Sequence, residues 1–282
     1  MRRARTALCG LLAWLAASTG AGAEPESEFS VLTYNTHGLS AWIAGDDPER
    51  RFPLLLERSN AYDVVLLQED FAYHELVRKH ASHPLVVRGN GPAWSWLGFS
   101  GSGLTVLART PSPRIQRARA YGHCHGWLSA ANDCFANKGY LMLRLRVADG
   151  VEIDVWNTHL DAGIENGDHA ARTVQLDLLA ADIARESRGR ALVVGGDFNT
   201  DWADPRDRAL LESFVGRIGA SIAVNASHQR WPQRLDYLLM RSGTRIALDL
   251  VAGGIAEEFI DSEGVSLSDH PALWGRFRVS AR

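Results

Sequence analysis

Ala191-Leu-Val-Val-Gly-Gly-Asp-Phe-Asn199 is the stretch that decides the fold, an apolar run that ends in glycines and polar side chains. A short run rich in valine and bounded by turn residues is typical of a strand buried on both faces of a sheet. We therefore expect a strand over Ala191–Gly195, with Asp197 and Asn199 just beyond its end. Residues of this type often cap turns, and alone the stretch indicates only a turn after a buried strand.

The same arrangement recurs along the chain. Phe29–Tyr34 and Asp63–Gln68 are further apolar runs of the kind that forms buried strands. Polar clusters follow strands at Tyr34–His37, Gln68–Asp70, Asn157–His159 and Gly196–Asn199. Side chains at strand ends can converge on one rim of a sheet, which is where open α/β folds commonly place their sites. The repeated pattern therefore indicates a functional site.

The remaining periodicity indicates alternating strands and helices in one domain from Phe29 to Val279, since no repeat, low-complexity tract or linker divides it. Apolar residues at helical spacing predict a helix over Pro48–Asn60. A second predicted helix, Ala170–Ser187, ends just before Gly189. Further strands are predicted at Gly103–Ala108, Gly139–Val147, Glu152–Thr158, Leu235–Met240 and Ala272–Val279.

The N-terminal residues have the features of a secretory signal peptide: a positive start, an apolar stretch from Leu8 to Leu15, and small residues before Glu24. We expect a signal peptide over residues 1–23, a mature catalytic domain over 24–282, and export to the periplasm or the extracellular medium. The apolar stretch is shorter than the roughly 20 residues that cross a bilayer, which disfavours a retained anchor. We expect no transmembrane segment elsewhere.

The 282 residues are 46% hydrophobic and 22% charged, an ordinary globular composition that can supply one substantial core. Loss of the signal peptide with its three arginines would take the formal net charge from −3 to −6. A mildly acidic chain is poorly suited to sequence-independent binding of nucleic acid, which depends on phosphate neutralisation. Arg114, Arg117 and Arg119 form a modest basic cluster that a nuclease could use, but the acidic total favours a solvated surface segment.

Loss of the signal peptide also removes Cys9 and leaves Cys124 and Cys134. An even number of cysteines in an exported chain favours a disulfide between them. The alternative is a metal site, because His123 and His125 flank Cys124 and add two further ligands. The spacing of these residues matches no standard zinc pattern, so we expect the disulfide.

The polar clusters contain the residue types that hydrolysis of a phosphodiester needs. That reaction requires a hard cation to neutralise phosphate oxygens, a base to activate water, and groups that stabilise the leaving oxygen. Mg²⁺ prefers one or two carboxylates together with waters and substrate phosphate. The candidates beside the strands are Asn35, Glu69, His159, Asp197, Asn199, Asp236, Asp269 and His270.

Six short motifs occur in a fixed order, and each is weak alone. They are Tyr34-Asn35, Leu67-Gln68-Glu69, Asn157-Thr158-His159-Leu160, Gly196-Asp197-Phe198-Asn199, Leu235-Asp236-Tyr237 and Ser268-Asp269-His270. Together they resemble the endonuclease/exonuclease/phosphatase superfamily, which includes DNase I, exonuclease III-type repair enzymes, inositol-polyphosphate phosphatases and neutral sphingomyelinases. The resemblance covers nearly the whole mature chain. It implies an α/β fold, a four-layer α-β-β-α sandwich of two mixed sheets flanked by helices (DNase I-like).

The resemblance also implies a metal site. Glu69 would bind Mg²⁺ (or Mn²⁺), Asn35 beside it would position metal or phosphate, and Asp269 would reach a metal. Asp70 departs from the family pattern, which more often has an apolar residue after the glutamate. Adjacent side chains on a strand point to opposite faces, so we expect Asp70 outside the site of Glu69 unless the strand has already ended.

The remaining candidates take roles in catalysis by the same resemblance. His270 would be the general base on the attacking water, and Asp236 would orient and stabilise its imidazole, as a carboxylate does for a catalytic histidine. His159 would donate a hydrogen bond or a proton toward the phosphate. Asp197 and Asn199 would align the nucleophile and stabilise the transition state.

Three features favour a sphingomyelinase-like substrate. Export argues against DNA repair and against intracellular phosphoinositide turnover. Asn137-Lys138-Gly139 resembles the Lys-Gly element that precedes the corresponding strand of sphingomyelinases, so Lys138 would meet a phosphate; a solvated turn is the alternative. Trp94 and Trp96 would touch lipid if their loop is exposed, since tryptophan favours membrane interfaces, but their alternation also suits a half-buried strand.

The expected protein is therefore a secreted, monomeric phosphodiesterase that depends on a divalent metal and has sphingomyelinase-like phospholipase C activity. Its expected partner is a phosphodiester substrate such as a phospholipid at a membrane surface. An extracellular DNase I-like endonuclease that acts on nucleic acid is the main alternative. A non-enzymatic binding module on the same fold is a third, and the full set of catalytic residue types argues against it.

Overall fold

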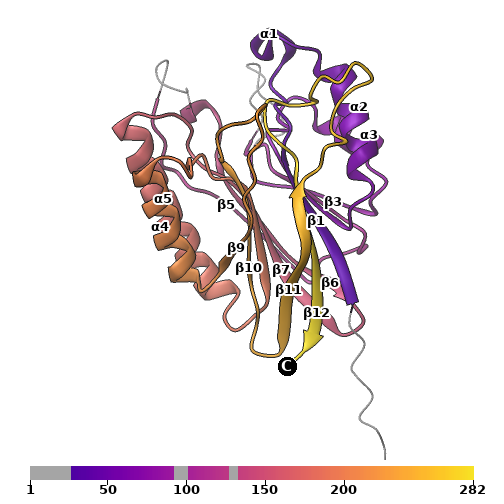
Figure 1. Ribbon diagram of the computed structural model, residues 1–282, viewed down its shortest axis with the longest axis vertical. Helices are drawn as coiled ribbons and strands as arrows, with labels where there is room; N and C mark the ends of the chain where they lie inside the picture. The colour runs from indigo at the N-terminus through magenta and orange to yellow at the C-terminus, as the bar shows by residue number, and fades with distance from the viewer. Residues whose placement is uncertain (1–26, 92–100, 127–132) are drawn as a thin grey trace, which may run out of the picture.

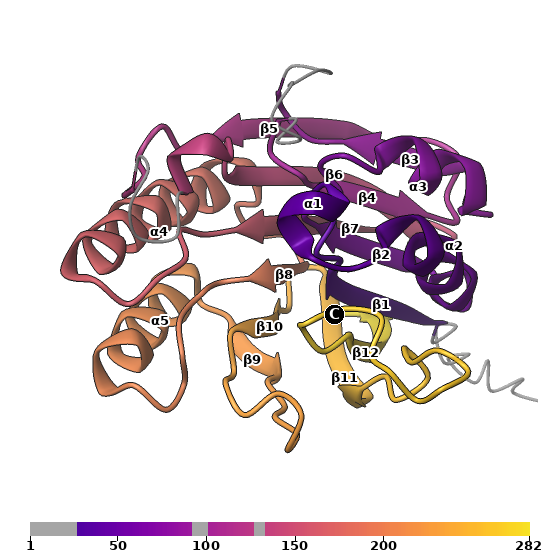
Figure 2. The same cartoon turned by 90° about the horizontal axis from the view of Figure 1, so that it is seen from above.

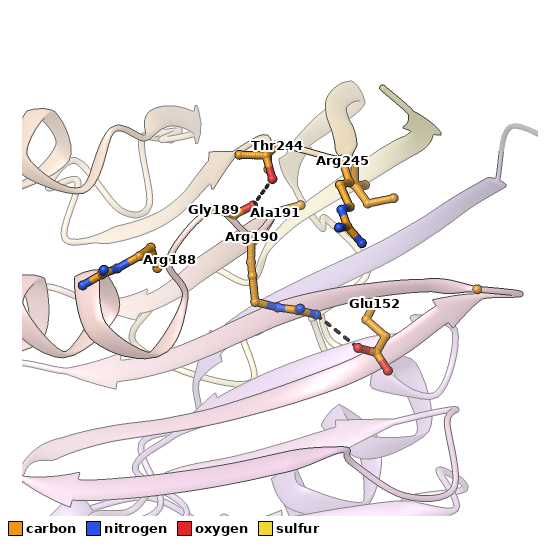
Figure 3. Close-up of a pocket in the computed structure, with 10 residues that line it drawn as sticks. Glu152, Arg188, Gly189, Arg190, Ala191, Thr244 and Arg245 are labelled. Carbon is orange, nitrogen blue, oxygen red and sulfur yellow. Dashed lines mark hydrogen bonds and ion pairs between the residues drawn. The ribbon is translucent and has the colours of Figure 1, made fainter.

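The computed structural model describes residues 27–91, 101–126 and 133–282. Its strands form two six-stranded sheets that stack face to face, and helices cover the outer face of each sheet (Figures 1 and 2). Each sheet contains both parallel and antiparallel neighbours. The predicted α-β-β-α sandwich of two mixed sheets is confirmed.

The first sheet has its parallel pair in the interior. Its strand order is β11 (Ile246–Ile255), β12 (Leu273–Ala281), β1 (Ser27–Asn35), β2 (Val64–Gln68), β4 (Thr105–Ala108) and β3 (Leu85–Arg88). β1 and β2 run parallel, with Asn35 opposite Gln68, and the other neighbouring strands are antiparallel. The polar residues that follow β1 and β2 therefore lie at the same end of this sheet.

The second sheet repeats this arrangement. Its order is β5 (Ile115–Ala120), β6 (Gly139–Ala148), β7 (Val151–His159), β8 (Leu192–Asp197), β10 (Asp236–Arg241) and β9 (Ser221–Val224). β7 and β8 are parallel and end together, with His159 opposite Asp197. β10 starts where β8 ends, because Asp236 pairs with Asp197 in the antiparallel register.

Two helices lie against each outer sheet face (Figure 2). They are α2 (Pro48–Ser59) and α3 (His74–His80) on the first sheet, and α4 (Asn166–Glu186) and α5 (Pro205–Ile218) on the second. A single helical turn, α1 (Ala41–Ala44), follows β1 at the upper end of the molecule in Figure 1, and the 3₁₀ turn η1 (Asp133–Phe135) precedes β6.

Local sequence explains where α2 and α5 begin. Asp47 and Asp204 each accept hydrogen bonds from backbone N–H groups of the first turn, and a proline occupies the first helical position after each of them. Both features satisfy or remove donors that a helix N-terminus leaves without partners. α5 ends at Gly219, whose φ of +64° is the left-handed conformation that glycine adopts most easily.

Three apolar layers fill the sandwich. The layer between the sheets contains side chains such as Leu66 and Val193, while Phe52 packs between the first sheet and its helices and Phe214 between the second sheet and its helices. The inner strands of both sheets are therefore buried on both faces. This is why their sequences are nearly continuous apolar runs rather than alternating ones.

Two predicted elements differ at their starts. The helix predicted over Ala170–Ser187 begins earlier because Glu165 and Asp168 form a capping box at its N-terminus. The strand predicted from Gly103 begins only at Thr105, since Gly103 has a left-handed φ of +62°. A side chain at Gly103 would also collide with the ring of Phe71.

Several elements are absent from the sequence prediction, namely α1, α3, α5, β3, β5, β9 and β11. The strands among them lie at or next to sheet edges and are partly exposed, so they lack the continuous apolar runs of the inner strands. The pair Asp204-Pro205 together with Gly219 is the sequence signal that would have located α5.

Candidate active site

The candidate site lies where the two parallel strand pairs end, at the upper end of the molecule in Figure 1. Asn35 ends β1, Glu69 follows β2, His159 ends β7 and Asp197 ends β8. The face-to-face packing of the sheets brings these four side chains together, although they are far apart in the sequence.

Asn35 connects the two sheets at the centre of the site. Its Nδ2 donates to Glu69 Oε1 at 3.1 Å and to Asp197 Oδ2 at 3.0 Å. Its Oδ1 accepts from the backbone N–H of His37 at 3.1 Å, which fixes the orientation of the amide. Asn35 therefore presents its nitrogen to the carboxylates and holds them next to each other.

The two carboxylates lie in a poorly solvated environment. Burial raises the pKa of Glu69, and the positive charges of Lys138 and His270 only partly oppose this effect. Burial also raises the pKa of Asp197 to about 6, although His270 acts in the opposite direction. A half-buried and a buried carboxylate beside each other, both with raised pKa values, indicate a site that lacks positive charge.

His270 and Asp236 form a close pair at the edge of the site. His270 Nδ1 lies 2.9 Å from Asp236 Oδ2, and its Nε2 lies 3.7 Å from Asp197 Oδ2. Burial disfavours the imidazolium, but Asp236 and Asp197 outweigh it and raise the pKa of His270 well above its usual value. Nδ1 can donate to Asp236 whether the ring is neutral or protonated, and Nε2, which lies nearer Asp197, can accept a proton in the neutral ring.

Ser268 fixes the backbone that carries His270. Its Oγ donates to the carbonyl oxygen of Asn35 at 2.7 Å and accepts from the backbone N–H of His270 at 3.3 Å. The loop before β12 is thereby attached to the end of β1. His270 and Asn35 consequently keep a fixed relation to each other.

His159 is buried beside both carboxylates. Its Nε2 lies 3.4 Å from Asp197 Oδ2 and 3.8 Å from Glu69 Oε1. Burial lowers the pKa of His159 well below the usual value, and the cations Lys138 and His270 add to this effect. The imidazole is therefore neutral at physiological pH.

Asn199 closes the loop after β8. Its backbone N–H donates to Asp197 Oδ1 at 2.9 Å, and its side-chain nitrogen donates to the carbonyl oxygen of Leu160 at 3.0 Å. The same Leu160 donates its N–H to the carbonyl oxygen of Asp197 at 3.0 Å. The ends of β7 and β8 are thus held together by side chains of the Gly-Gly-Asp-Phe-Asn motif.

Strained backbone is concentrated in these loops. In the part of the chain that the structure describes, the non-glycine residues with positive φ are His37 (48°), Glu69 (57°) and Asn199 (48°). Such conformations cost on the order of 1–3 kcal/mol each and persist mainly where function requires them. All three lie at the ends of strands that form the site.

The left-handed conformation of Glu69 also explains the position of Asp70. β2 ends at Gln68, so the alternation of strand faces no longer applies to the next two residues. Asp70 is fully buried, and its Oδ2 lies 2.6 Å from His74 Nδ1 and 2.7 Å from Thr105 Oγ1. It contacts a different set of residues from Glu69.

Asp269 and Lys138 lie at the margin of the cluster. The Asp269 carboxylate is 58% exposed and contacts Ser268 Oγ at 3.2 Å and His37 Nδ1 at 3.8 Å. Lys138 is buried, pairs with Asp133, and donates to the carbonyl oxygen of Leu160 at 2.8 Å. The solvated turn considered for Lys138 is therefore wrong, since its ammonium group lies inside the protein.

Arg51 is not among the residues predicted from the sequence, yet it holds three segments of the site together. Its guanidinium donates to the carbonyl oxygens of Thr36 at 3.0 Å, His37 at 3.0 Å and Leu267 at 2.7 Å, and it pairs with Asp46 at 2.9 Å. The loops that follow β1 and precede His270 thus share one buried cation. No local motif marks this residue, because an arginine on α2 is unremarkable until its partners are known.

The cysteines form the expected disulfide. Cys124 and Cys134 are bonded, with their Cα atoms 5.2 Å apart. His125, a ligand in the alternative metal hypothesis, instead places its Nδ1 2.7 Å from Asp168 Oδ1. The disulfide prediction is confirmed, and the alternative metal site at these residues is wrong.

The basic cluster that favoured a nuclease is neutralised in the structure. Arg114 pairs with Glu152 at 3.0 Å, Arg117 with Glu186 at 3.6 Å and Arg119 with Asp182 at 2.8 Å. These arginines belong to the edge strand β5 and its approach.

An α-β-β-α sandwich with carboxylates, amides and imidazoles at one end defines a DNase I-like protein. The model of the Endonuclease/Exonuclease/phosphatase family matches residues 32–270, and the chain belongs to that family. Sphingomyelinases of Mycobacterium bovis and Mycobacterium tuberculosis are 31% identical to it over 267 residues, which is 88% of this chain and 52% of theirs. The chain thus spans about half the length of the curated relatives it matches.

Solved structures share the fold. Sphingomyelinase C from Streptomyces griseocarneus has 20% identity and a TM-score of 0.65, covering 89% of this chain and 99% of that one. A β toxin mutant from Staphylococcus aureus with bound magnesium ions has 14% identity and a TM-score of 0.63, covering 91% and 100%. At these identities the likeness concerns the fold alone.

Some predictions concern residues outside the described ranges. They are the signal peptide over residues 1–23 and the lipid contact of Trp94 and Trp96. Among the described residues, no helix has both the length and the apolar character that crossing a bilayer requires.

Proposed function

We propose that this protein is an exported phosphodiesterase that depends on a divalent metal and has sphingomyelinase-like phospholipase C activity. The observation that carries the proposal is the bridge of Asn35 between Glu69 and Asp197. It places the half-buried carboxylate of Glu69 and the buried carboxylate of Asp197 beside His159 and beside the pair formed by His270 and Asp236. A site of this composition suits in-line attack of a water molecule on phosphorus.

His270 is the proposed general base. Asp236 holds its Nδ1, so Nε2 is the nitrogen that takes a proton from the attacking water. The oxygen of that water forms a bond to phosphorus while the bond from phosphorus to the ester oxygen of the leaving alcohol breaks. Asp197 and Asn199 align the water and stabilise the transition state.

Glu69 is the proposed ligand of Mg²⁺ (or Mn²⁺), with Asn35 and Asp269 beside it. The residues fit a divalent cation, because burial raises the pKa of both Glu69 and Asp197 and nearby positive charge does not compensate fully. When bound, the ion would neutralise a phosphate oxygen as a Lewis acid.

Asp197, Asp236 and His270 form a second set of ligand atoms, all within 4.8 Å of one another. An ion held by this set would compete with the 2.9 Å contact between His270 and Asp236. Occupation of that set would therefore remove the proposed base. For this reason we assign the metal to the side of Glu69.

His159 and Lys138, which are both buried, are proposed to stabilise the phosphate. A neutral imidazole is a poor proton source at physiological pH, so His159 is assigned as a hydrogen-bond donor through Nε2. The leaving oxygen then takes its proton from solvent. Lys138 supplies positive charge near the carboxylates, and a direct contact with phosphate would require it to leave Asp133.

The substrate is proposed from the relatives and from the sequence. Curated relatives named sphingomyelinase match 88% of the chain, and residues 1–23 have the pattern of a signal peptide. We accordingly propose one catalytic domain over residues 24–282, a monomer, that acts on phospholipid at a membrane surface in the periplasm or outside the cell. A DNase I-like endonuclease is the weaker alternative, because the three arginines it would use are paired with acids.

One panel of substrates tests the proposal. The purified protein is incubated with sphingomyelin vesicles, phosphatidylcholine vesicles and supercoiled plasmid, each with Mg²⁺ and with excess chelator. We expect phosphocholine release from sphingomyelin only when Mg²⁺ is present, and intact plasmid. Plasmid nicking without phosphocholine release would establish the endonuclease instead, and activity in excess chelator would exclude the metal.

A further inference from the structure

A cavity of about 270 Å³ opens directly beside His270. Its lining includes Asp236, Asp269 and His270 together with the segment Arg230–Gln233. The inference drawn from this cavity rests on the proposed function, because it uses the direction of attack that His270 defines.

The direction of attack decides which part of a diester can occupy the cavity. In an in-line displacement the attacking water and the leaving oxygen lie on opposite sides of phosphorus. The water lies on the side of His270, so the leaving alcohol points away from that residue. The substituent that stays on the phosphate is the one that can turn into a cavity next to His270.

The lining offers a cation an aromatic ring and an exposed carboxylate, against the positive charges of Arg230 and of His270 when its ring is protonated. Trp231 supplies an aromatic ring, and the Asp269 carboxylate, which is 58% exposed, supplies negative charge at the rim. The guanidinium carbon of Arg230 already lies 5.5 Å from the centre of the Trp231 ring. A ring that holds one cation against its face is suited to hold another of similar size, since the attraction comes from the ring quadrupole.

The ring is held in place before any ligand arrives. His228 and Trp231 pair through two backbone hydrogen bonds, of 3.1 Å and 2.9 Å, and the residue Trp231 is only 9% exposed. The backbone N–H of Arg230 donates to His228 Nδ1 at 3.2 Å. A rigid aromatic wall of this kind loses little entropy when a ligand binds.

We propose that this cavity binds the retained headgroup of the substrate, that the headgroup is a small quaternary ammonium such as choline, and that Trp231 determines this specificity. Arg230 competes for the same ring, because its guanidinium has the charge of the ligand and lies where the ligand would bind. Removing the ring should therefore weaken selection for a cation, and removing the guanidinium should strengthen it.

Two soluble esters with the same leaving group test the proposal. They are p-nitrophenylphosphorylcholine, which retains choline, and methyl p-nitrophenyl phosphate, which retains only a methyl group. The selectivity is the ratio of kcat/KM for the two esters, measured with Mg²⁺. We expect the native protein to favour the choline ester. The ratio should fall about 10-fold in Trp231→Leu and stay near the native value in Trp231→Phe. It should rise in Arg230→Gln, because the competing guanidinium is removed.

The methyl ester serves as the control in every variant. A substitution that damages folding or the proposed base lowers kcat/KM for both esters and leaves their ratio unchanged. A ratio near one in the native protein, or a ratio that Trp231→Leu does not change, would overturn the assignment of the cavity.

Failure of the proposed function gives a different result. If the protein hydrolyses neither ester, the phosphodiesterase assignment is wrong, and calorimetric binding of phosphocholine and methyl phosphate still tests the cavity. Tighter binding of phosphocholine, weakened about 10-fold by Trp231→Leu, would support the inference, and equal binding would refute it.

Discussion

His270 and Asp236 are expected to act as one unit. Asp236 holds the imidazole in the orientation that presents Nε2 to water, so the carboxylate has no separate task once the ring is removed. We predict that His270→Ala and Asp236→Asn each lower kcat by about 10²- to 10⁴-fold. The double variant should be no slower than His270→Ala alone.

The measurement is steady-state hydrolysis by the two single variants and the double variant, with thermal unfolding as a control for folding. A double variant with the product of the two single losses would mean that Asp236 acts independently of the histidine. Near-native turnover by His270→Ala would remove it from the role of base.

Arg51 gives a second prediction at the scale of one residue. Arg51→Met removes the donor of three carbonyl oxygens and leaves Asp46 without its cation, so we expect a loss of about 3 kcal/mol or more in the free energy of unfolding. Arg51→Lys should recover part of that stability. The kcat of Arg51→Lys should nevertheless remain below that of the native protein. A single ammonium group cannot reproduce the several hydrogen bonds of the planar guanidinium that hold the loops of the site.

The neighbouring Arg50 offers a matched control. Its side chain is 55% exposed and contacts Asp261 at 3.5 Å, so Arg50→Met should change stability by less than about 1 kcal/mol. Urea unfolding of the three variants provides the comparison. Equal effects of Arg50→Met and Arg51→Met would mean that the buried contacts of Arg51 contribute nothing specific.

The candidate catalytic residues could be located from the sequence because each lies next to a strand that is apolar on both faces. Local sequence does not reveal the interactions between those residues. Three features depend on segments that come together only in the folded protein. They are the hydrogen bonds of Asn35 to both carboxylates, the left-handed backbone at Glu69 and the hydrogen bonds of Arg51 to three carbonyl oxygens. Lys138 is a further example. Its neighbours in the sequence are compatible with a solvated turn, and only the folded structure shows that it is buried and paired with Asp133.

At the scale of elements, α4 is attached to the second sheet through Asp182. Its carboxylate accepts from Tyr140 Oη and from Arg119 Nη1, both at 2.8 Å, and pairs with Arg185 at 2.6 Å. Burial alone would raise the pKa of Asp182, but the hydrogen bonds from these three residues outweigh it and lower the pKa. A carboxyl with a lowered pKa stabilises the folded state at pH values above its unfolded pKa of about 4.

We therefore predict that this stabilisation is complete at neutral pH and is lost as the pH falls through the lowered pKa of Asp182. Asp182→Asn should lower the free energy of unfolding by about 1–3 kcal/mol at pH 7 and by much less at pH 2 to 3. Asp177→Asn is the control, since Asp177 lies on the same helix and its carboxylate is largely exposed. Urea unfolding across this pH range gives the comparison, and an equal loss at every pH would contradict the prediction.

The elements that sequence predicts and those that it misses differ in burial. Inner strands such as β2 and β8 are buried along their whole length, so their composition alone identifies them. Strand β5 at the edge of the second sheet has mostly intermediate or exposed residues, including arginines, and resembles a loop in composition. Pairing with β6 makes it a strand, and that contact is not encoded locally.

At the scale of the whole molecule, the disulfide constrains the segment before β6. Cys124 and Cys134 are ten residues apart, and in the chain-entropy model a loop of this length adds about 2–3 kcal/mol of stability. We predict that the double variant Cys124→Ser and Cys134→Ser unfolds at lower temperature than the native protein. Reductant should lower the melting temperature of the native protein to the same value and leave that of the variant unchanged.

Calorimetry with and without reductant makes this comparison for both proteins. A variant that melts at the native temperature would show that the bond contributes little to stability. A reductant effect on the variant would point to another origin for the change.

The pairing of β1 with β12 has a consequence for biosynthesis. β1 is made well before β12 but cannot complete its pairing until β12 has been made, and His270 lies just before β12. A nascent chain that has not reached this point already contains Asn35, Glu69, His159 and Asp197, yet it lacks the proposed base, and β1 can pair only with β2. Such long-range pairing delays folding. On the proposed function, the chain therefore stays inert toward the membranes of the cell that makes it until β12 has been made.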